Sequence, residues 1–245
     1  MPITDLSPPP PLAPDVALFL DFDGTLVELA EAPDAISVPH HLPRLLTRLG
    51  ERLDGRIGII SGRALADLER HLDCRGFAVS GSHGAELRLG DGTSLPVETP
   101  ESLSAARIAV RALATRFPLL IVEEKPAGIA VHYRRVPEAQ DAVIALMTEL
   151  AEGDGFVLQR GKMVAELRPR GADKGAALRR LMREPKFAGA RPLFVGDDLT
   201  DEDAFAAAAS INGAGILVGP PRKTAARWRL ADVAAVAAWL EEGAR

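Results

Sequence analysis

The stretch that decides the fold is Val16-Ala-Leu-Phe-Leu-Asp-Phe-Asp-Gly-Thr-Leu26, close to the start of the chain. It opens with five apolar residues, and such a continuous run is typical of a strand buried on both faces of a parallel sheet. Two carboxylates, Asp21 and Asp23, follow at once, and Gly24 permits a tight turn. Ligands of open α/β sheets bind beyond the carboxyl ends of the strands, so we expect a functional site at this turn.

Strands and helices alternate on either side of a different middle segment, and this alternation predicts βαβ units with a parallel sheet. The apolar runs predict strands at 16–22, 56–61, 77–80, 192–195 and 216–218. Helical spacing of apolar residues predicts helices at 41–53, 64–72, 175–182, 201–209 and 231–242. The fold class that follows is α/β, with a Rossmann-like core.

The middle of the chain has a different predicted order of elements: helix, two strands, helix and two strands. The helices are predicted at 102–117 and 137–150, and the strands at 119–124, 128–134, 156–159 and 163–167. This order predicts a small α+β domain with an antiparallel sheet, inserted into the core. We therefore divide the chain into a proline-rich disordered lead-in (1–14), an α/β core (15–101 and 169–245) and an inserted domain (102–168).

Composition excludes several classes of protein. The chain has 245 residues, of which 47% are hydrophobic and 26% charged, which is ordinary for a globular protein. Its net charge of −5 does not indicate the basic surface that binds nucleic acids. No apolar stretch approaches the roughly 18–20 residues that span a bilayer. The N-terminus lacks the basic region of a secretory signal, and the lone Cys74 favours a reducing compartment. We expect a cytoplasmic protein; a monomer is compatible with the sequence, which leaves the oligomeric state open.

A second acidic stretch, Gly196-Asp-Asp-Leu-Thr-Asp-Glu-Asp203, follows another predicted strand. Five carboxylates within seven residues repel one another unless a cation compensates them, and an oxygen-rich site suits Mg²⁺. The alternative is a solvated helix N-terminus, in which Asp201 and Glu202 would favour the helix dipole. That alternative is serious for 201–203 and weaker for Asp197, which lies at a strand end as Asp21 does.

Two further features could bind phosphate, and each has an ordinary alternative. Ser61 precedes Gly62 and Arg63 at a strand end, where its hydroxyl could contact phosphate or simply cap a helix. Lys174 begins a predicted helix, where it could contact phosphate or be a plain surface cation. An Asp-Gly-Thr turn is by itself also common.

Taken together and in order, these features resemble the four motifs of the haloacid dehalogenase (HAD) superfamily. The resemblance implies that Asp21 is the nucleophile, which forms an aspartyl-phosphate, and that Asp23 is the general acid and then the base. It also implies a Mg²⁺ ion held by the Asp21 side chain, the Asp23 carbonyl and Asp197. Asp198, counted among the metal residues, and Asp201 would each ligate the ion, reach it through water or orient other groups, and the sequence does not decide which of the two contacts it directly. The expected phosphate-binding residues are Thr25, Ser61 and Lys174.

The inserted domain lies where this superfamily carries a C2-type cap, which closes over the site and selects the substrate. Three more motifs are similar to those of the trehalose-6-phosphate phosphatase family: Gly81-Ser-His-Gly-Ala-Glu86, Glu123-Glu-Lys125 with Val131-His-Tyr-Arg134, and Ala165-Glu-Leu-Arg-Pro169. This likeness implies sugar contacts from Glu123, Lys125 and Glu166. The alternative for Glu123 and Lys125 is a solvated strand end. We expect Arg63 and His132 to contact the substrate as well, and His83 and Glu86 to shape the site.

The resemblance thus implies Mg²⁺-dependent hydrolysis of trehalose 6-phosphate to trehalose and phosphate, the last step of trehalose biosynthesis. One alternative is a HAD phosphatase for another sugar phosphate, such as that of sucrose or mannosylglycerate. A different class of alternative is a non-catalytic sugar-phosphate sensor, which would need neither Asp21 nor Asp23. The expected partner is in each case a small molecule, not a nucleic acid or a membrane.

Overall fold

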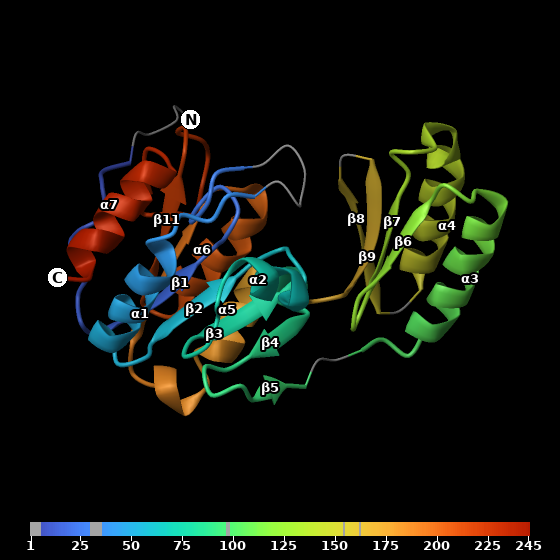
Figure 1. Cartoon of the computed structure of the whole chain (residues 1–245). Coiled ribbons are helices and arrows are strands. Elements are labelled where there is room, and N and C mark those ends of the chain that lie inside the picture. The colour runs from blue at the N-terminus through green and yellow to red at the C-terminus, as the bar shows by residue number, and fades with distance from the viewer. Residues whose placement is uncertain (1–5, 30–35, 97–98, 154, 162) are drawn as a thin grey trace. The chain divides into compact units, whose positions relative to one another are not determined.

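The computed structural model describes residues 6–29, 36–96, 99–153, 155–161 and 163–245. The chain divides into two compact units (Figure 1). The first comprises the described residues of Met1–Leu95 and Asp173–Arg245, and the second those of Pro96–Ala172. Each unit has its own sheet and its own apolar core.

The first unit contains an eight-stranded sheet in the order β12-β11-β10-β1-β2-β3-β4-β5. Its strands are β1 Val16–Leu20, β2 Ile57–Ile60, β3 Ala78–Gly81, β4 Glu86–Arg88, β5 Ser94–Leu95, β10 Arg191–Gly196, β11 Ala214–Val218 and β12 Trp228–Leu230. The six strands from β12 to β3 pair in parallel, and β4 and β5 add an antiparallel edge. The predicted α/β core with a mainly parallel sheet is confirmed.

Helices cover both faces of this sheet (Figure 1). They are α1 Leu42–Arg52, α2 Leu65–His71, α5 Lys174–Leu181, α6 Glu202–Ser210 and α7 Val233–Gly243. Successive side chains of a strand point to opposite faces, so Leu18 packs with α1, α2 and α7, whereas Phe19 packs with α5 and α6. All of β1 is buried, which explains why its sequence is a continuous apolar run.

The position of β1 in the sheet determines where a ligand can bind. Its parallel neighbours are β2 on one side and β10 on the other, so the chain order reverses at β1. Such a switch point opens a crevice outside the carboxyl ends of the strands. The loops after β1, β2 and β10 carry Asp21, Ser61 and Asp197, which the fold therefore collects at one edge.

The proline-rich segment before β1 lies against the core, contrary to our prediction for it. We expected residues 1–14 to be disordered, but the described part, residues 6–14, contacts the core. Leu12 is 4% exposed and packs in the same cluster as β1, while Trp239 donates its indole N–H to the carbonyl of Pro10 at 2.9 Å. Prolines lack the N–H that a sheet would need, yet an extended segment can still dock through side chains and carbonyls. Residues 1–5 lie outside the described residues.

The second unit is a four-stranded antiparallel sheet in the order β6-β7-β9-β8, with two helices packed on one face. Its elements are α3 Leu103–Arg116, β6 Ile121–Glu124, β7 Ile129–His132, α4 Gln140–Glu152, β8 Phe156–Gly161 and β9 Val164–Pro169. Alternate residues of β7, Ile129 and Val131, are fully buried against the helices. The predicted order of helices and strands in this segment matches the structure.

Three short strands, β4, β5 and β12, were not predicted, because two or three residues at a sheet edge have no readable apolar pattern.

Cys74 is buried at 3% exposure, and burial raises the pKa of its thiol to about 11. In the part of the chain that the structure describes, no helix is both long and apolar enough to cross a membrane.

Candidate active site

The turn after β1 is built around Gly24. The sheet pairing continues one residue past β1, since the Asp21 N–H donates to the Val195 carbonyl at 2.9 Å. Gly24 then adopts a φ of +74°, and a β-carbon there would lie 2.2 Å from Oδ2 of Asp197. Glycine is therefore needed both for the backbone conformation and for the close approach of the two loops.

Three carboxylates converge beyond the strand ends. Carboxylate oxygens of Asp21, Asp197 and Asp201 all lie within 4.8 Å of one another. A β-carbon at Gly196 would lie 2.3 Å from Cγ of Asp201, so the absence of a side chain at the end of β10 admits this carboxylate. From the sequence we expected Asp21 and Asp197 at this position, and the role of Asp201 was open.

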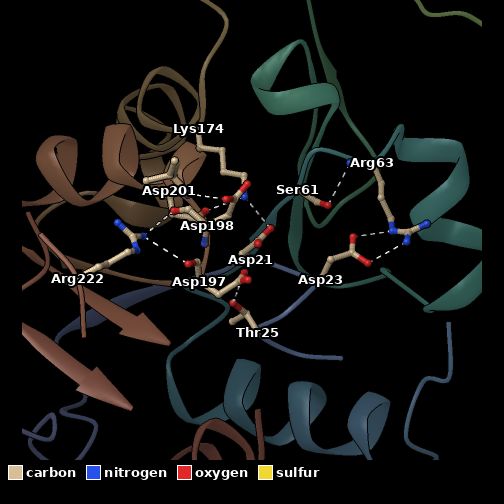
Figure 2. A network of polar contacts seen from close by, with 11 residues as sticks. Asp21, Asp23, Thr25, Ser61, Arg63, Lys174, Asp197, Asp198, Asp201 and Arg222 are labelled. Carbon is tan, nitrogen blue, oxygen red and sulfur yellow. Dashed lines mark hydrogen bonds and ion pairs between the residues drawn. The ribbon is translucent and has the colours of Figure 1, made fainter. Parts of the chain in front are cut away.

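Lys174 joins the cluster from the first turn of α5 (Figure 2). Its Nζ lies 2.8 Å from Oδ1 of Asp21 and 2.6 Å from Oδ1 of Asp201, and its side chain is 3% exposed. Lys174 is thus not the surface cation that the sequence left open as an alternative. The N-cap of α5 is Asp173, whose side chain accepts the N–H of Ala176 at 2.6 Å and fixes where the helix begins.

The electrostatics of the cluster favour a second cation. Burial raises the pKa of Asp21 well above its ordinary value, and Lys174 offsets only part of this effect. Burial and the charge of Asp201 raise the pKa of Asp197 to about 6, and burial also raises the pKa of Asp201. Burial opposes the charge of Lys174, but the two carboxylates outweigh it and raise its pKa.

This donor set fits a hard divalent ion. The three carboxylates come from two loops and a 3₁₀ turn, and one lysine leaves them with excess negative charge. Carboxylate oxygens in such a cluster are the ligands that Mg²⁺ prefers. The fit rests on the donor atoms and on the raised pKa values, which a bound cation would lower again.

Asp198 lies beside the cluster but uses its carboxylate otherwise. Oδ1 of Asp198 accepts the N–H of Leu199 at 2.7 Å, which caps the 3₁₀ helix Leu199–Asp201. Its own N–H donates to Oδ2 of Asp201 at 2.9 Å. Asp198 therefore orients Asp201 through its backbone, which is one of the roles that the sequence left open for it.

Asp23 is directed toward the loop after β2 (Figure 2). Both of its carboxylate oxygens accept from Arg63, Oδ2 from Nε at 2.7 Å and Oδ1 from Nη2 at 2.8 Å. We expected Arg63 to contact the substrate, and the structure places its guanidinium against the carboxylate of Asp23.

The two hydroxyls expected to bind phosphate are both buried at strand ends. The Thr25 hydroxyl lies 3.5 Å from Oδ1 of Asp197. Oγ of Ser61 accepts the N–H of Arg63 at 3.2 Å, so it caps its own loop. Together with Lys174 of α5, these side chains come from two loops and one helix of the first unit, and the structure brings all three segments to the edge where β1 ends.

The turn from 81 to 86 supports the loop after β2. Ser82 and His83 have φ values of +48° and +55°, which are unusual for residues other than glycine. The N–H of His83 donates to the Ser61 carbonyl at 3.0 Å. Oε1 of Glu86 accepts from the Ser82 hydroxyl at 2.6 Å and from the N–H of Leu65 at 3.3 Å. His83 and Glu86 thus hold backbone, consistent with the expectation that they shape the site.

Arg222 is a site residue that the sequence analysis missed. Its guanidinium donates to the backbone carbonyl of Asp198 at 2.8 Å and pairs with Glu202. Glu202 also accepts the N–H of Ala225 at 2.7 Å, so the loop between β11 and β12 is tied to the acidic loop after β10. No local pattern marks this arginine, because its contacts with Asp198 and Glu202 span 20 or more residues.

The second unit holds a separate polar cluster on its sheet. Lys125 Nζ lies 2.7 Å from Oε1 of Glu166, and His132 Nε2 lies 3.0 Å from Oε2 of Glu123. The register pairs Glu123 with Ala130 and Ala130 with Glu166, so both carboxylates share one face with a methyl group between them. The hydrogen bond from His132 lowers the pKa of Glu123, and Lys125 is only 8% exposed.

Comparisons with known proteins agree with this architecture. The family profile described as trehalose-phosphatase matches residues 19–234. A trehalose-6-phosphate phosphatase of Escherichia coli K12 is 36% identical over 238 residues, covering 96% of this chain and 89% of the relative. The structure of a C. albicans trehalose-6-phosphate phosphatase C-terminal domain superposes with a TM-score of 0.72 at 26% identity, covering 94% of this chain and 91% of the other.

A phosphatase of the haloalkanoate (HAD) enzyme superfamily from Bacteroides thetaiotaomicron shares the fold, with a TM-score of 0.61 at 18% identity. The alignment covers 91% of this chain and 92% of that one.

Proposed function

The chain belongs to the trehalose-phosphatase family, and we propose that it hydrolyses trehalose 6-phosphate to trehalose and phosphate with Mg²⁺ and an aspartyl-phosphate intermediate. The observation that carries the proposal is the contact between Asp21 and Lys174 beside Asp197 and Asp201, at the sheet's switch point. A nucleophilic carboxylate, a phosphate-binding cation and a metal-binding set are the parts that this chemistry needs.

In the first step, a carboxylate oxygen of Asp21 attacks phosphorus, and the bond from phosphorus to the sugar oxygen breaks. The leaving oxygen takes a proton from Asp23, so the sugar departs as a neutral alcohol. In the second step, a water molecule gives its proton to Asp23 and attacks phosphorus. The Asp21–phosphorus bond then breaks, and free phosphate and the original carboxylate are restored.

The residues proposed to hold Mg²⁺ are the carboxylates of Asp21, Asp197 and Asp201, with the backbone carbonyl of Asp23. The sequence left open which of Asp198 and Asp201 contacts the metal, and we propose Asp201 because the carboxylate of Asp198 caps a turn. When bound, Mg²⁺ would neutralise negative charge on the phosphoryl oxygens. Lys174, Ser61 and Thr25 are proposed to bind phosphate, since each lies buried at the same edge of the sheet.

We propose that the cluster of the second unit binds the hydroxyls of the sugar. Two carboxylates and an ammonium group offer charge-assisted hydrogen bonds, which discriminate sugars by the direction of each hydroxyl. Glu123, Lys125, His132 and Glu166 are the residues proposed for this role. The Lys125–Glu166 pair is nearly buried, which holds both groups in fixed positions.

The proposal is tested by phosphate release across a panel of sugar phosphates, with and without EDTA. We expect trehalose 6-phosphate to be hydrolysed fastest and EDTA to abolish the activity, with full recovery on excess Mg²⁺. A preference for sucrose or mannosylglycerate phosphate would assign the chain to another substrate. Ligand-induced thermal stabilisation without turnover would instead identify a sensor, and activity indifferent to EDTA would contradict the metal requirement.

Glutamine at 123 and 166 tests the sugar site. Each substitution keeps the side-chain shape but removes a negative charge, so we expect kcat/KM for trehalose 6-phosphate to fall by about 10- to 100-fold per site. Glu124→Gln is the matched control, because this carboxylate pairs with Arg111 at an exposed position. Unchanged kcat/KM in both Glu123→Gln and Glu166→Gln would remove the sugar contacts from this cluster.

We further propose a cytoplasmic location, which the single, buried cysteine supports.

A further inference from the structure

Within the described part of the chain, the guanidinium of Arg63 holds the carboxylate of Asp23. Arg63 donates from Nε and Nη2 to the two oxygens of the Asp23 carboxylate, at 2.7 and 2.8 Å. Two parallel bonds from a planar guanidinium fix both the position and the plane of a carboxylate, which a single contact does not. The Asp23 side chain is still 28% exposed, so without these bonds the surrounding packing would leave it room to rotate.

Arg63 is itself held from its far side. Its Nη1 donates to Oδ2 of Asp67, on the first turn of α2, at 2.7 Å. Its guanidinium carbon lies 6.0 Å from the ring centre of Phe22, the buried residue between Asp21 and Asp23. The Arg63 side chain is 13% exposed. The contacts with Asp67 on α2 and with Phe22 in the loop after β1 therefore direct the guanidinium of Arg63 at Asp23.

The backbone of Arg63 is equally constrained. Its N–H donates to Oγ of Ser61 at 3.2 Å, and its carbonyl accepts the N–H of Ser82 at 2.7 Å. A β-carbon at Gly81 would lie 2.9 Å from this carbonyl, so the close approach of the two segments depends on the glycine. These hydrogen bonds fix the backbone from which the Arg63 side chain extends toward Asp23.

We propose that Arg63 is a positioning residue, which holds the carboxyl group of Asp23 for the proton transfers of the reaction. The inference rests on the proposed function of Asp23. Proton transfer requires the carboxyl oxygen within hydrogen-bond reach of the leaving oxygen, and a side chain free to rotate spends little time there. Asp67 acts one step further out, because it orients Arg63 and not Asp23.

The test compares Arg63→Met, Arg63→Lys and Asp67→Asn with wild type in kcat, KM and inhibition by inorganic phosphate. General acid–base groups contribute about 10²- to 10⁴-fold, so we expect Arg63→Met to lower kcat by about 10- to 100-fold, with KM nearly unchanged. Lysine should restore only part of kcat because it lacks the fork, and Asp67→Asn should lose less than Arg63→Met. Arg75→Met is the control, since that side chain is 90% exposed and pairs with Asp73, outside this network.

Two results would overturn the proposal. A kcat of Arg63→Met within twofold of wild type would show that Asp23 needs no such support. A higher KM and weaker phosphate inhibition with unchanged kcat would make Arg63 a substrate contact, as the sequence first suggested. An unchanged circular dichroism spectrum of Arg63→Met, and partial recovery of kcat in Arg63→Lys, show that an observed change does not come from misfolding. The wild-type rate in the same assay tests the proposed function separately, because its absence would remove that function and not only the role of Arg63.

Discussion

Replacement of Asp21 by asparagine is expected to abolish phosphate release while the protein stays folded. The amide has nearly the same shape but cannot form the acyl-phosphate, so we expect a loss on the order of 10⁴-fold or more in kcat. Because burial raises the pKa of Asp21, the charged carboxylate disfavours the folded state near neutral pH. Asp21→Asn should therefore unfold no earlier than wild type in a thermal melt.

Two measurements make this expectation decisive. Rapid quenching of wild type with substrate, followed by intact mass spectrometry, should detect one added phosphoryl group that Asp21→Asn lacks. Asp54→Asn is the matched control, because Asp54 is 77% exposed and pairs only at the surface of the same unit. Turnover above a trace in Asp21→Asn, with no covalent adduct in wild type, would replace the covalent mechanism by direct attack of water.

Replacement of Lys174 by methionine is expected to damage both stability and activity. The ammonium is the cation between the buried carboxylates of Asp21 and Asp201, at 2.8 and 2.6 Å. Removing one partner of a buried ion pair costs about 3–5 kcal/mol of the free energy of unfolding, because the remaining charges stay buried. We also expect kcat to fall by about 10²- to 10³-fold, since one donor to the phosphoryl oxygens is lost.

A second substitution separates these two effects. In Lys174→Met/Asp201→Asn the buried negative charge is reduced, so urea unfolding in EDTA should recover part of the lost stability. Activity should not recover, because both the phosphate contact and a proposed metal ligand are missing. Lys186→Met is the control, as its ammonium lies 3.6 Å from Asp54 with a side chain 54% exposed. Equal stability of Lys174→Met and wild type would show that this lysine does not balance the cluster.

The fold follows from the sequence to the extent that burial leaves a local pattern. The run from Val16 to Leu20 predicted a central parallel strand, because a strand covered on both faces is apolar throughout. The helix at Leu42–Arg52 was equally clear, since its leucines recur on one face. Strands β5 and β12 left no such trace, because edge strands of two or three residues acquire their conformation from the neighbour that they pair with.

The candidate site was predicted less completely than the fold. The sequence placed Asp21, Ser61 and Asp197 at strand ends, and parallel strands bring their ends to one edge. It did not show whether Asp198 or Asp201 enters the cluster, because that choice depends on the 3₁₀ turn after β10. The proline-rich start was misjudged for a related reason, since the contact that orders it lies with Trp239 at the other end of the chain.

The sequence by itself determined the α/β core, the inserted antiparallel unit, the family and the carboxylates at the strand ends. These features depend on residue type and on spacing along the chain, which hydrophobic burial and strand geometry translate directly into structure. Only the tertiary structure decided that Arg63 turns to Asp23, that Lys174 is buried between two carboxylates and that Arg222 braces the acidic loop. Such contacts join residues that are 20 or more positions apart, and the direction of a long charged side chain depends on partners that only folding brings near it.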